Sequence, residues 1–283
     1  MRISAIGQTQ KFEVIGHRGN SGNPLNSLNI ENTIPAFNSA FALGANGIEL
    51  DVILTKNRDL VVHHDDRLGR VFLMAGNELQ KLVSEYNTWQ LFETELNLKG
   101  LTEELLKKDS HLTKNINVKF PFLYEVQIPK DKKLFLELKF LDDKLPQDKT
   151  YLKAITKAAV EFITEHGLTN QTYVLCFVPE ALDEVKNLND KITTAHNIHQ
   201  GEASDLEKIK QLQKSYGFDI MNPPFAQATK EAIENMHHAG VKTYPWVWKE
   251  GSRQEIDEVR RLFLEEADGV ISNQVEAALN AIY

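Results

Sequence analysis

The sequence predicts an α/β fold, a TIM (β/α)8 barrel with a small insertion domain after the second strand. From residue 134 onward, short apolar runs alternate with amphipathic segments, a pattern typical of parallel strands with helices outside. With the runs before residue 134, the chain offers eight βα units in 283 residues, which suits a closed barrel. An open doubly wound sheet is the alternative, but no glycine-rich phosphate loop follows the first strand.

The elements predicted before residue 54 are a strand at 12–17, a helix at 32–43 and a strand at 47–53. A further apolar run at 60–64 follows after only about six residues, whereas a parallel crossover needs a dozen or more. We therefore expect 60–64 to return antiparallel and to lie outside the ring of strands.

Residues 54–120 are more polar than their surroundings and rich in Lys, Glu, Leu and Asn. We interpret them as an insertion domain, which leaves residues 1–53 and 121–283 to form the barrel. The segment from Pro121 to Val126 is expected to begin the helix of the second unit.

Strands and helices alternate over the rest of the chain. Apolar residues of helix 149–166 recur at helical spacing, and Gly167 and Gly240 follow helix ends, where glycine is common. The predicted strands are 134–140, 172–178, 191–197, 219–222, 242–248 and 269–272. The predicted helices are 149–166, 179–188, 203–214, 227–239, 252–265 and 274–282.

Composition limits the classes of partner. The net charge of −8 argues against nucleic acid, and no segment approaches the roughly 18 apolar residues of a membrane span. We therefore expect no stable membrane association. Because no signal-peptide-like stretch opens the chain, we also expect a cytoplasmic protein. A secreted form that has lost its signal would have the same sequence. The single cysteine, Cys176, is flanked by apolar residues and is expected to be a buried thiol.

Ionisable residues lie within or at the ends of these strand-like runs. Such charges are costly to bury unless they pair or bind a metal ion. They are His17 and Arg18, Glu49 and Asp51, His64, and Glu137 and Lys139. Together they suggest acid–base chemistry on a phosphate held by a metal ion.

A metal site is predicted at Glu49, Asp51 and Glu137. Glu49 and Asp51 share one face of a strand, and Glu137 lies on the next strand of the ring. Three carboxylates with no clustered His or Cys favour Ca²⁺ or Mg²⁺ over zinc. The alternative is that Glu49 and Asp51 are exposed strand residues. Glu137 argues against it, because this residue is set among apolar neighbours.

The order and spacing of these blocks resemble the glycerophosphodiester phosphodiesterase family. The matching blocks are His17-Arg18-Gly19, Glu31-Asn32-Thr33, Glu49-x-Asp51-Val52, Val61-Val62-x-His64-Asp65 and Glu137-x-Lys139. The resemblance implies a small-molecule phosphodiester substrate and metal-dependent hydrolysis of glycerophosphodiesters to sn-glycerol 3-phosphate and an alcohol. It makes His17 and His64 the catalytic acid and base, in an order left open, with Trp246 near the glycerol and Phe177 a weaker candidate of the same kind. Arg18 and Lys139 are expected to bind the phosphate.

Other residues have simpler interpretations. Alternation sends His63 to the face opposite His64, and His237 and His238 suit a helix C-terminus. His111 and His166 are treated as structural or surface groups. His199 follows a predicted strand and can reach the mouth of the barrel. Tyr244, Trp246 and Trp248 fall on one face of the seventh strand. The block Glu31-Asn32-Thr33 can cap the first helix.

The chain departs from the family pattern at its last strand. Gly-x-x-Thr-Asp-x-Pro is usual there, whereas this chain has Gly269-Val270-Ile271-Ser272-Asn273-Gln274. This puts substrate choice in doubt. The alternatives are an enzyme of the sphingomyelinase D or lysophospholipase D type acting on lipid headgroups, and a non-catalytic phosphate-binding protein.

Overall fold

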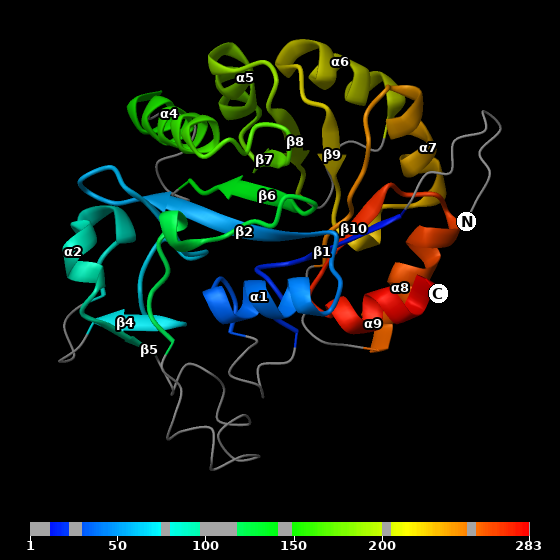
Figure 1. The fold of residues 1–283 in the computed structure, drawn as a ribbon. Helices are drawn as coiled ribbons and strands as arrows, with labels where there is room; N and C mark the ends of the chain where they lie inside the picture. The colour runs from blue at the N-terminus through cyan, green and yellow to red at the C-terminus, as the bar shows by residue number, and fades with distance from the viewer. Residues whose placement is uncertain are drawn as a thin grey trace.

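The main sheet is a ring of parallel strands. The computed structural model describes residues 12–22, 30–74, 80–96, 118–140, 149–199, 205–247 and 253–282. The strand order is β10-β1-β2-β6-β7-β8-β9 (Figure 1). The strands are β1 (Glu13–Gly16), β2 (Gly47–Leu54), β6 (Lys133–Leu138), β7 (Thr172–Cys176), β8 (Thr193–Asn197), β9 (Ile220–Asn222) and β10 (Gly269–Ser272). All neighbouring pairs in this order are parallel, as the alternating pattern predicts.

Isolated bridges close the ring between β9 and β10. Lys242 pairs with Ile220, and Trp246 pairs with both Pro224 and Ile271. The strand predicted at 242–248 is therefore reduced to single bridges on the described residues 242–247, because Pro245 has no N–H to donate to a ladder. The closure nevertheless confirms the barrel over the open sheet.

Helices surround the ring in Figure 1. They are α1 (Ile34–Ala42), α4 (Lys149–Glu165), α5 (Pro179–Leu188), α6 (Leu206–Tyr216), α7 (Lys230–His238), α8 (Arg253–Leu264) and α9 (Val275–Ile282). Capping residues set several helix ends. Thr33 and Thr229 cap the starts of α1 and α7 through their side chains. Gly217 ends α6 in the left-handed region at a φ of 66°.

The interior of the ring is packed, as is usual for a barrel of this size. It consists of one inward-facing apolar residue from most strands and from the bridging segment: Ile15, Phe135, Leu175, Ala195, Ile220, Tyr244 and Ile271. A larger buried cluster lies between the outer faces of the strands and the helices. The polar residues described below therefore lie at the end of a filled barrel, not in a channel.

The segment after β2 forms its own small structure. Strand β3 (Leu60–Val62) pairs antiparallel with β2, as expected from the short connection. Strands β4 (Phe72–Met74) and β5 (Thr94–Leu96) form a separate ribbon beside the short helix α2 (Thr88–Leu91) (Figure 1). They share a hydrophobic cluster that includes Phe72, Tyr86 and Phe122. The division into a barrel and an insertion domain at residues 54–120 remains our proposal.

The helix predicted to begin at Pro121 is wrong. Residues Leu123–Glu125 form one 3₁₀ turn, and the described chain then runs to β6 without an α-helix. The side chain of Glu125 accepts the N–H of Phe122 at 3.0 Å, which closes the turn on itself. Phe122 is buried in the cluster after β2, whereas Leu123 and Val126 are buried in the larger cluster of the barrel, so this segment joins the two.

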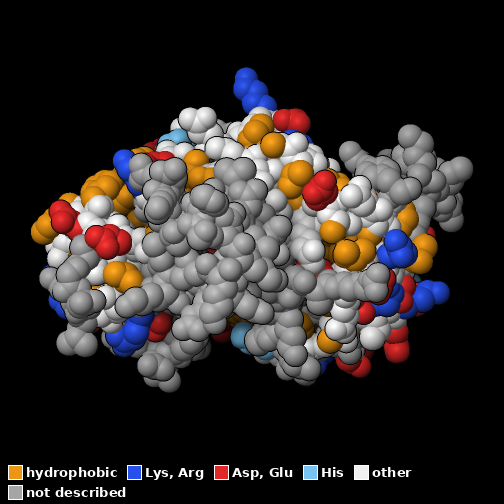
Figure 2. All heavy atoms as spheres, turned by 90° about the horizontal axis from the view of Figure 1, so that it is seen from below, with side chains coloured by type: hydrophobic (Ala, Val, Ile, Leu, Met, Phe, Trp, Pro, Cys, Tyr) orange, Lys and Arg blue, Asp and Glu red, His pale blue; other side chains and the backbone are white. Residues whose placement is uncertain are grey.

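The described surface is mixed in character. In Figure 2, which views the molecule from below Figure 1, acidic, basic and hydrophobic side chains are interspersed around the undescribed atoms. Among the described residues, no helix is both long and apolar enough to cross a membrane.

Candidate active site

The predicted site residues meet in one cavity of 420 Å³ at the carboxyl ends of the strands. This is where barrel enzymes build their active sites. The residues of the prediction that line it are His17, Arg18, Glu49, His64, Glu137, Lys139, Phe177 and Trp246, and His199 is present as well. Asp51 is 1 % exposed and lies behind this lining, in contact with several of its members.

Strand register brings the three carboxylates together. Asp51 pairs directly with Glu137 across β2 and β6, and Glu49 lies two residues earlier on the same face of β2. One oxygen from each of the three lies within 4.8 Å of the others. All three side chains are buried, so the interpretation of Glu49 and Asp51 as exposed strand residues is excluded.

The carboxylate cluster fits a hard divalent cation. Oε1 of Glu49 is buried and has no hydrogen-bond partner among the described residues. Burial, followed by the charges of Asp51 and Glu137, raises the pKa of Glu49 well above its usual value. An orphaned buried oxygen beside two further carboxylates is relieved by a cation with oxygen ligands, such as Ca²⁺ or Mg²⁺.

Two basic side chains border the carboxylates. Nζ of Lys139 lies 2.8 Å from Oε1 of Glu137 and 3.6 Å from Oδ1 of Asp51. Burial acts to lower the pKa of Lys139, but these two carboxylates raise it above its usual value, so the ammonium stays charged. Arg18 donates its backbone N–H to Glu49 at 2.8 Å, and its Nε lies 3.5 Å from Asp51. Its φ of 53° is unusual for a residue with a side chain.

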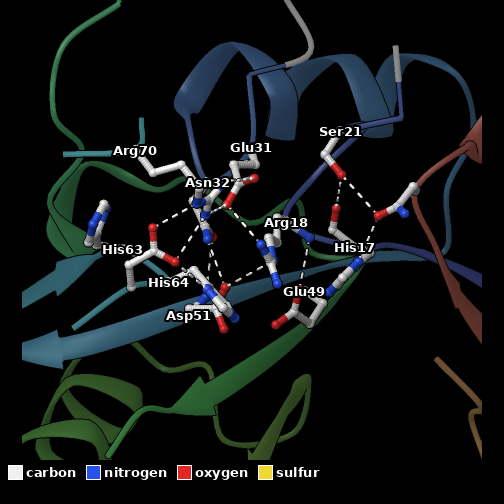
Figure 3. Close-up of polar contacts among 12 residues, drawn as sticks. His17, Arg18, Ser21, Glu31, Asn32, Glu49, Asp51, His63, His64 and Arg70 are labelled. Carbon is white, nitrogen blue, oxygen red and sulfur yellow. Dashed lines mark hydrogen bonds and ion pairs between the residues drawn. The ribbon is translucent and has the colours of Figure 1, made fainter. Parts of the chain in front are cut away.

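His17 follows β1 and is held by an amide oxygen (Figure 3). Its Nδ1 donates to Oδ1 of Asn273 at 2.7 Å, because an amide oxygen can only accept. Burial, followed by the charge of Arg18, lowers the pKa of His17 to about 3. The ring is therefore neutral near pH 7, and its Nε2, 4.0 Å from Glu49, carries the free lone pair.

His64 is paired with a carboxylate instead. Its Nδ1 donates to Oδ1 of Asp65 at 2.8 Å, and the ring lines the cavity. Asp65 keeps a well-lowered pKa despite burial, because it accepts hydrogen bonds from His64 and Arg70. A carboxylate therefore holds Nδ1 of His64, whereas a neutral amide oxygen holds Nδ1 of His17.

Buried amides support the carboxylates. Asn32 belongs to the Glu31-Asn32-Thr33 block, where only a cap was expected, and Asn197 and Asn222 were not predicted. Asn32 donates to Oδ2 of Asp51 at 2.7 Å and accepts the Asp51 N–H at 3.2 Å. Asn197 donates to Oε2 of Glu137 at 3.1 Å and is itself held by Asn222 at 3.1 Å. The sequence features that could have indicated these amides are the Glu31-Asn32-Thr33 block and the position of Asn197 at the end of a strand-like run. The cap role foreseen for that block is also confirmed, through Thr33.

Asn273, noted above as a departure from the family pattern, is part of the site. Its backbone N–H and the hydroxyl of Ser272 both donate to Oε1 of Glu255, at 2.9 and 2.6 Å. Glu255 is a buried residue of α8, and no sequence motif pointed to it. This contact positions the Asn273 amide toward His17.

Aromatic rings also line the cavity. The rings of Phe177 and Trp246 meet edge to face at 5.9 Å, and His199 stacks on Phe177 at 4.3 Å. Trp246 is fixed by its Nε1, which donates to the carbonyl of Asn222 at 3.1 Å. Tyr244 packs instead inside the barrel. Trp248 lies outside the described residues.

The remaining expectations concern residues away from the chemistry. His63 is buried against Phe120, with Nε2 at 3.2 Å from the carbonyl of Arg67, so its structural role is confirmed. His237 and His238 end α7, and His111 lies outside the described residues. Cys176 is buried, and burial raises the pKa of its thiol. It borders the cavity but is no thiolate nucleophile.

A closed parallel barrel whose strand ends gather carboxylates, histidines and cations around one cavity defines an α/β-barrel enzyme. Residues 17–277 match the model of the glycerophosphoryl diester phosphodiesterase family, and the chain belongs to that family. The resemblance seen in the sequence motifs is thereby confirmed.

Individual relatives agree over nearly the whole chain. A glycerophosphodiester phosphodiesterase of Caldanaerobacter subterraneus subsp. tengcongensis is 26% identical over 276 residues, 96% of this chain and 98% of that protein. The crystal structure of a putative glycerophosphoryl diester phosphodiesterase from Silicibacter pomeroyi has a TM-score of 0.79 and 20% identity, covering 97% of this chain and 94% of the other. A phosphodiesterase of Oleispira antarctica, solved with the product sn-glycerol-3-phosphate, has a TM-score of 0.71 and 20% identity, with 95% and 96% covered.

Proposed function

We propose that this chain hydrolyses glycerophosphodiesters to sn-glycerol 3-phosphate and an alcohol, with a divalent metal ion held by Glu49, Asp51 and Glu137. The observation that carries the proposal is the buried carboxylate trio, with its orphaned Glu49 oxygen, in one cavity with Arg18 and Lys139. Family membership supports the reaction class. The product bound to the Oleispira antarctica phosphodiesterase supports the glycerol phosphate part of the substrate.

The metal ion and the two basic residues together suit a phosphate. Ca²⁺ or Mg²⁺, when bound, would offset the charge of the carboxylates and polarise the phosphoryl oxygens. Arg18 offers a planar pair of donors and Lys139 a point charge, and both border the same cavity. Their existing ion pairs with Asp51 and Glu137 keep them oriented toward it before substrate arrives.

His17 is the general base in this proposal. Its neutral ring, held through Nδ1 by Asn273, leaves Nε2 free to accept a proton from the attacking oxygen. The attacker is either a glycerol hydroxyl of the substrate, which gives a cyclic phosphate that water then opens, or water itself. In either case one O–P bond forms and the bond to the leaving alcohol breaks.

His64 is the general acid. Asp65 holds its Nδ1, so that Nε2 is the ring atom that donates a proton to the departing alkoxide. His17 gains one proton and His64 loses one, so opening of a cyclic intermediate in the reverse sense restores both residues. The aromatic side formed by Phe177 and Trp246 then packs against the glycerol carbons.

The direct test is release of sn-glycerol 3-phosphate from glycerophosphocholine and glycerophosphoethanolamine, with Ca²⁺, with Mg²⁺ and with EDTA. We expect release that one or both metals support and that EDTA abolishes. Release unaffected by EDTA would refute the metal requirement. No release with either metal would refute the substrate assignment.

The lipid-headgroup alternative is tested in parallel. Lysophosphatidylcholine and sphingomyelin in vesicles serve as substrates, and sedimentation with the vesicles reports membrane association. We expect the soluble diesters to be preferred and the protein to stay in the supernatant. Faster turnover of the lipids would favour the alternative.

A further inference from the structure

Arg70 lies on the loop between β3 and β4, and it is not among the residues that line the cavity. Its guanidinium nevertheless holds two carboxylates at once (Figure 3). Nε and Nη2 donate to Asp65 at 2.7 and 3.1 Å. Nη1 and Nη2 donate to Glu31 at 2.7 and 2.6 Å. None of the motifs quoted above includes this arginine.

Each of the two carboxylates has a second partner inside the site. Oδ1 of Asp65 accepts from His64 at 2.8 Å, and Oε1 of Glu31 accepts from Arg18 at 2.8 Å. Arg70 therefore connects the loop that carries His64 to the segment before α1 and, through Arg18, to the metal-site region. No other described side chain joins Asp65 to Glu31.

Arg70 helps to keep the carboxylates of Asp65 and Glu31 charged. Burial opposes ionisation of Glu31, but hydrogen bonds and charge from Arg70, with the charge of Arg18, lower its pKa to about 2. Asp65, ionised and held by two hydrogen bonds from Arg70, is a fixed acceptor for Nδ1 of His64. Such an acceptor sets both the tautomer and the orientation of the His64 ring. Without Arg70, Asp65 would keep its contact with His64 but would lose the two hydrogen bonds that fix its carboxylate from the other side.

We propose that Arg70 is a positioning residue that acts through Asp65 to hold His64 in the orientation from which it protonates the leaving group. The inference rests on the proposed function, because it assumes His64 to be the acid. A lysine at position 70 cannot replace it fully, since an ammonium is a point charge and does not span two carboxylates as a guanidinium does.

Leaving-group dependence distinguishes this role from a merely structural one. Choline is a poor leaving group that needs a proton, whereas p-nitrophenolate departs without one. In Arg70→Ala we expect kcat for glycerophosphocholine to fall about 10- to 100-fold, with a smaller fall in Arg70→Lys. On glycerophospho-p-nitrophenol, kcat should change by less than about threefold, and His64→Ala should show the same contrast. Equal losses on both substrates in Arg70→Ala would overturn the proposal.

Arg67→Ala is the matched control, because Arg67 is an exposed arginine of the same loop whose backbone makes the contacts recorded for it. Its rates on both diesters should match those of the wild type. A loss equal to that of Arg70→Ala would show that any disturbance of the loop has this effect, and would overturn the assignment to Arg70.

A second readout needs no turnover, so it separates failure of this inference from failure of the proposed function. The ¹⁵N signals of the His64 ring, assigned with His64→Gln, report its tautomer and hydrogen bond in the folded protein. They should change in Arg70→Ala and stay unchanged in Arg67→Ala. A wild-type His64 signal in Arg70→Ala overturns the positioning role, whether or not the chosen diesters are substrates.

Discussion

Asn273, which stands where the family pattern has Asp, contacts His17, the proposed general base. Its amide oxygen accepts the Nδ1 proton of His17 at 2.7 Å, where the usual Asp would present a charge. A neutral acceptor fixes the ring and stabilises its protonated form less than a carboxylate would. This residue, directly after β10, therefore bears on the proposed base itself.

Replacing Asn273 by Asp tests this reasoning. The carboxylate should raise the pKa of His17, so a larger fraction of the base is protonated and inactive as pH falls. We expect the acidic limb of the pH profile of kcat/KM to move upward by about one pH unit. Asn273→Leu, which removes the acceptor without adding charge, is the control and should lower kcat/KM across the pH range. An unmoved limb in Asn273→Asp would show that His17 does not govern it.

The sequence predicted the residues that line the site better than it predicted the residues that hydrogen-bond to them. His17, Glu49, His64 and Glu137 were identifiable because ionisable groups are rare in strand-like apolar runs. Asn197 and Glu255 were not, because their partners are 60 and 18 residues away and become neighbours only when the barrel closes. Arg70 was equally hidden, since one of its two carboxylates lies 39 residues earlier.

At the level of elements, α8 fixes the loop after β10. Glu255 on α8 is buried and accepts from the Ser272 hydroxyl and from the Asn273 N–H, so the helix holds the residue that holds His17. Removing the acceptor would leave two buried donors unpaired.

Glu255→Ala should therefore lower the free energy of unfolding by about 1–3 kcal/mol, measured by urea denaturation. It should also lower kcat/KM, because Asn273 loses its backbone anchor. Asp257→Ala, an exposed acidic residue of the same helix, is the matched control and should change neither quantity. A Glu255→Ala protein as stable as the control would contradict the anchoring role.

Elements were predictable where local pattern and tertiary packing agree. The ranges 179–188 and 269–272 match α5 and β10. The prediction for 242–248 was incomplete because Pro245 interrupts hydrogen bonding that the barrel position would otherwise allow. The prediction for 121–126 was wrong because Phe122 is drawn into the cluster of the inserted segment, which the local sequence does not reveal.

On the scale of the whole molecule, ring closure places three carboxylates from adjacent strands at one end of the barrel. Without a cation these buried like charges oppose folding, as the raised pKa of Glu49 indicates. A ligand that binds only the folded state stabilises it, by about 2.7 kcal/mol at a hundred times its Kd.

Thermal unfolding should therefore respond to metal. We expect Ca²⁺ or Mg²⁺ to raise the Tm of the EDTA-treated protein. In Glu49→Gln the shift should be much smaller, because one ligand is weakened, while the metal-free Tm should be equal to or above that of the wild type. A metal-induced shift of equal size in both proteins would place the ion elsewhere.

In the proposed mechanism, His17 and His64 act as base and acid on a glycerophosphodiester in this cavity. The most direct measurement is the rate of sn-glycerol 3-phosphate release from glycerophosphocholine by the wild type, His17→Ala and His64→Ala, each saturated with the supporting metal. We predict a loss of about 10²- to 10⁴-fold in each variant with metal affinity largely retained. Wild-type rates in both variants would contradict the account.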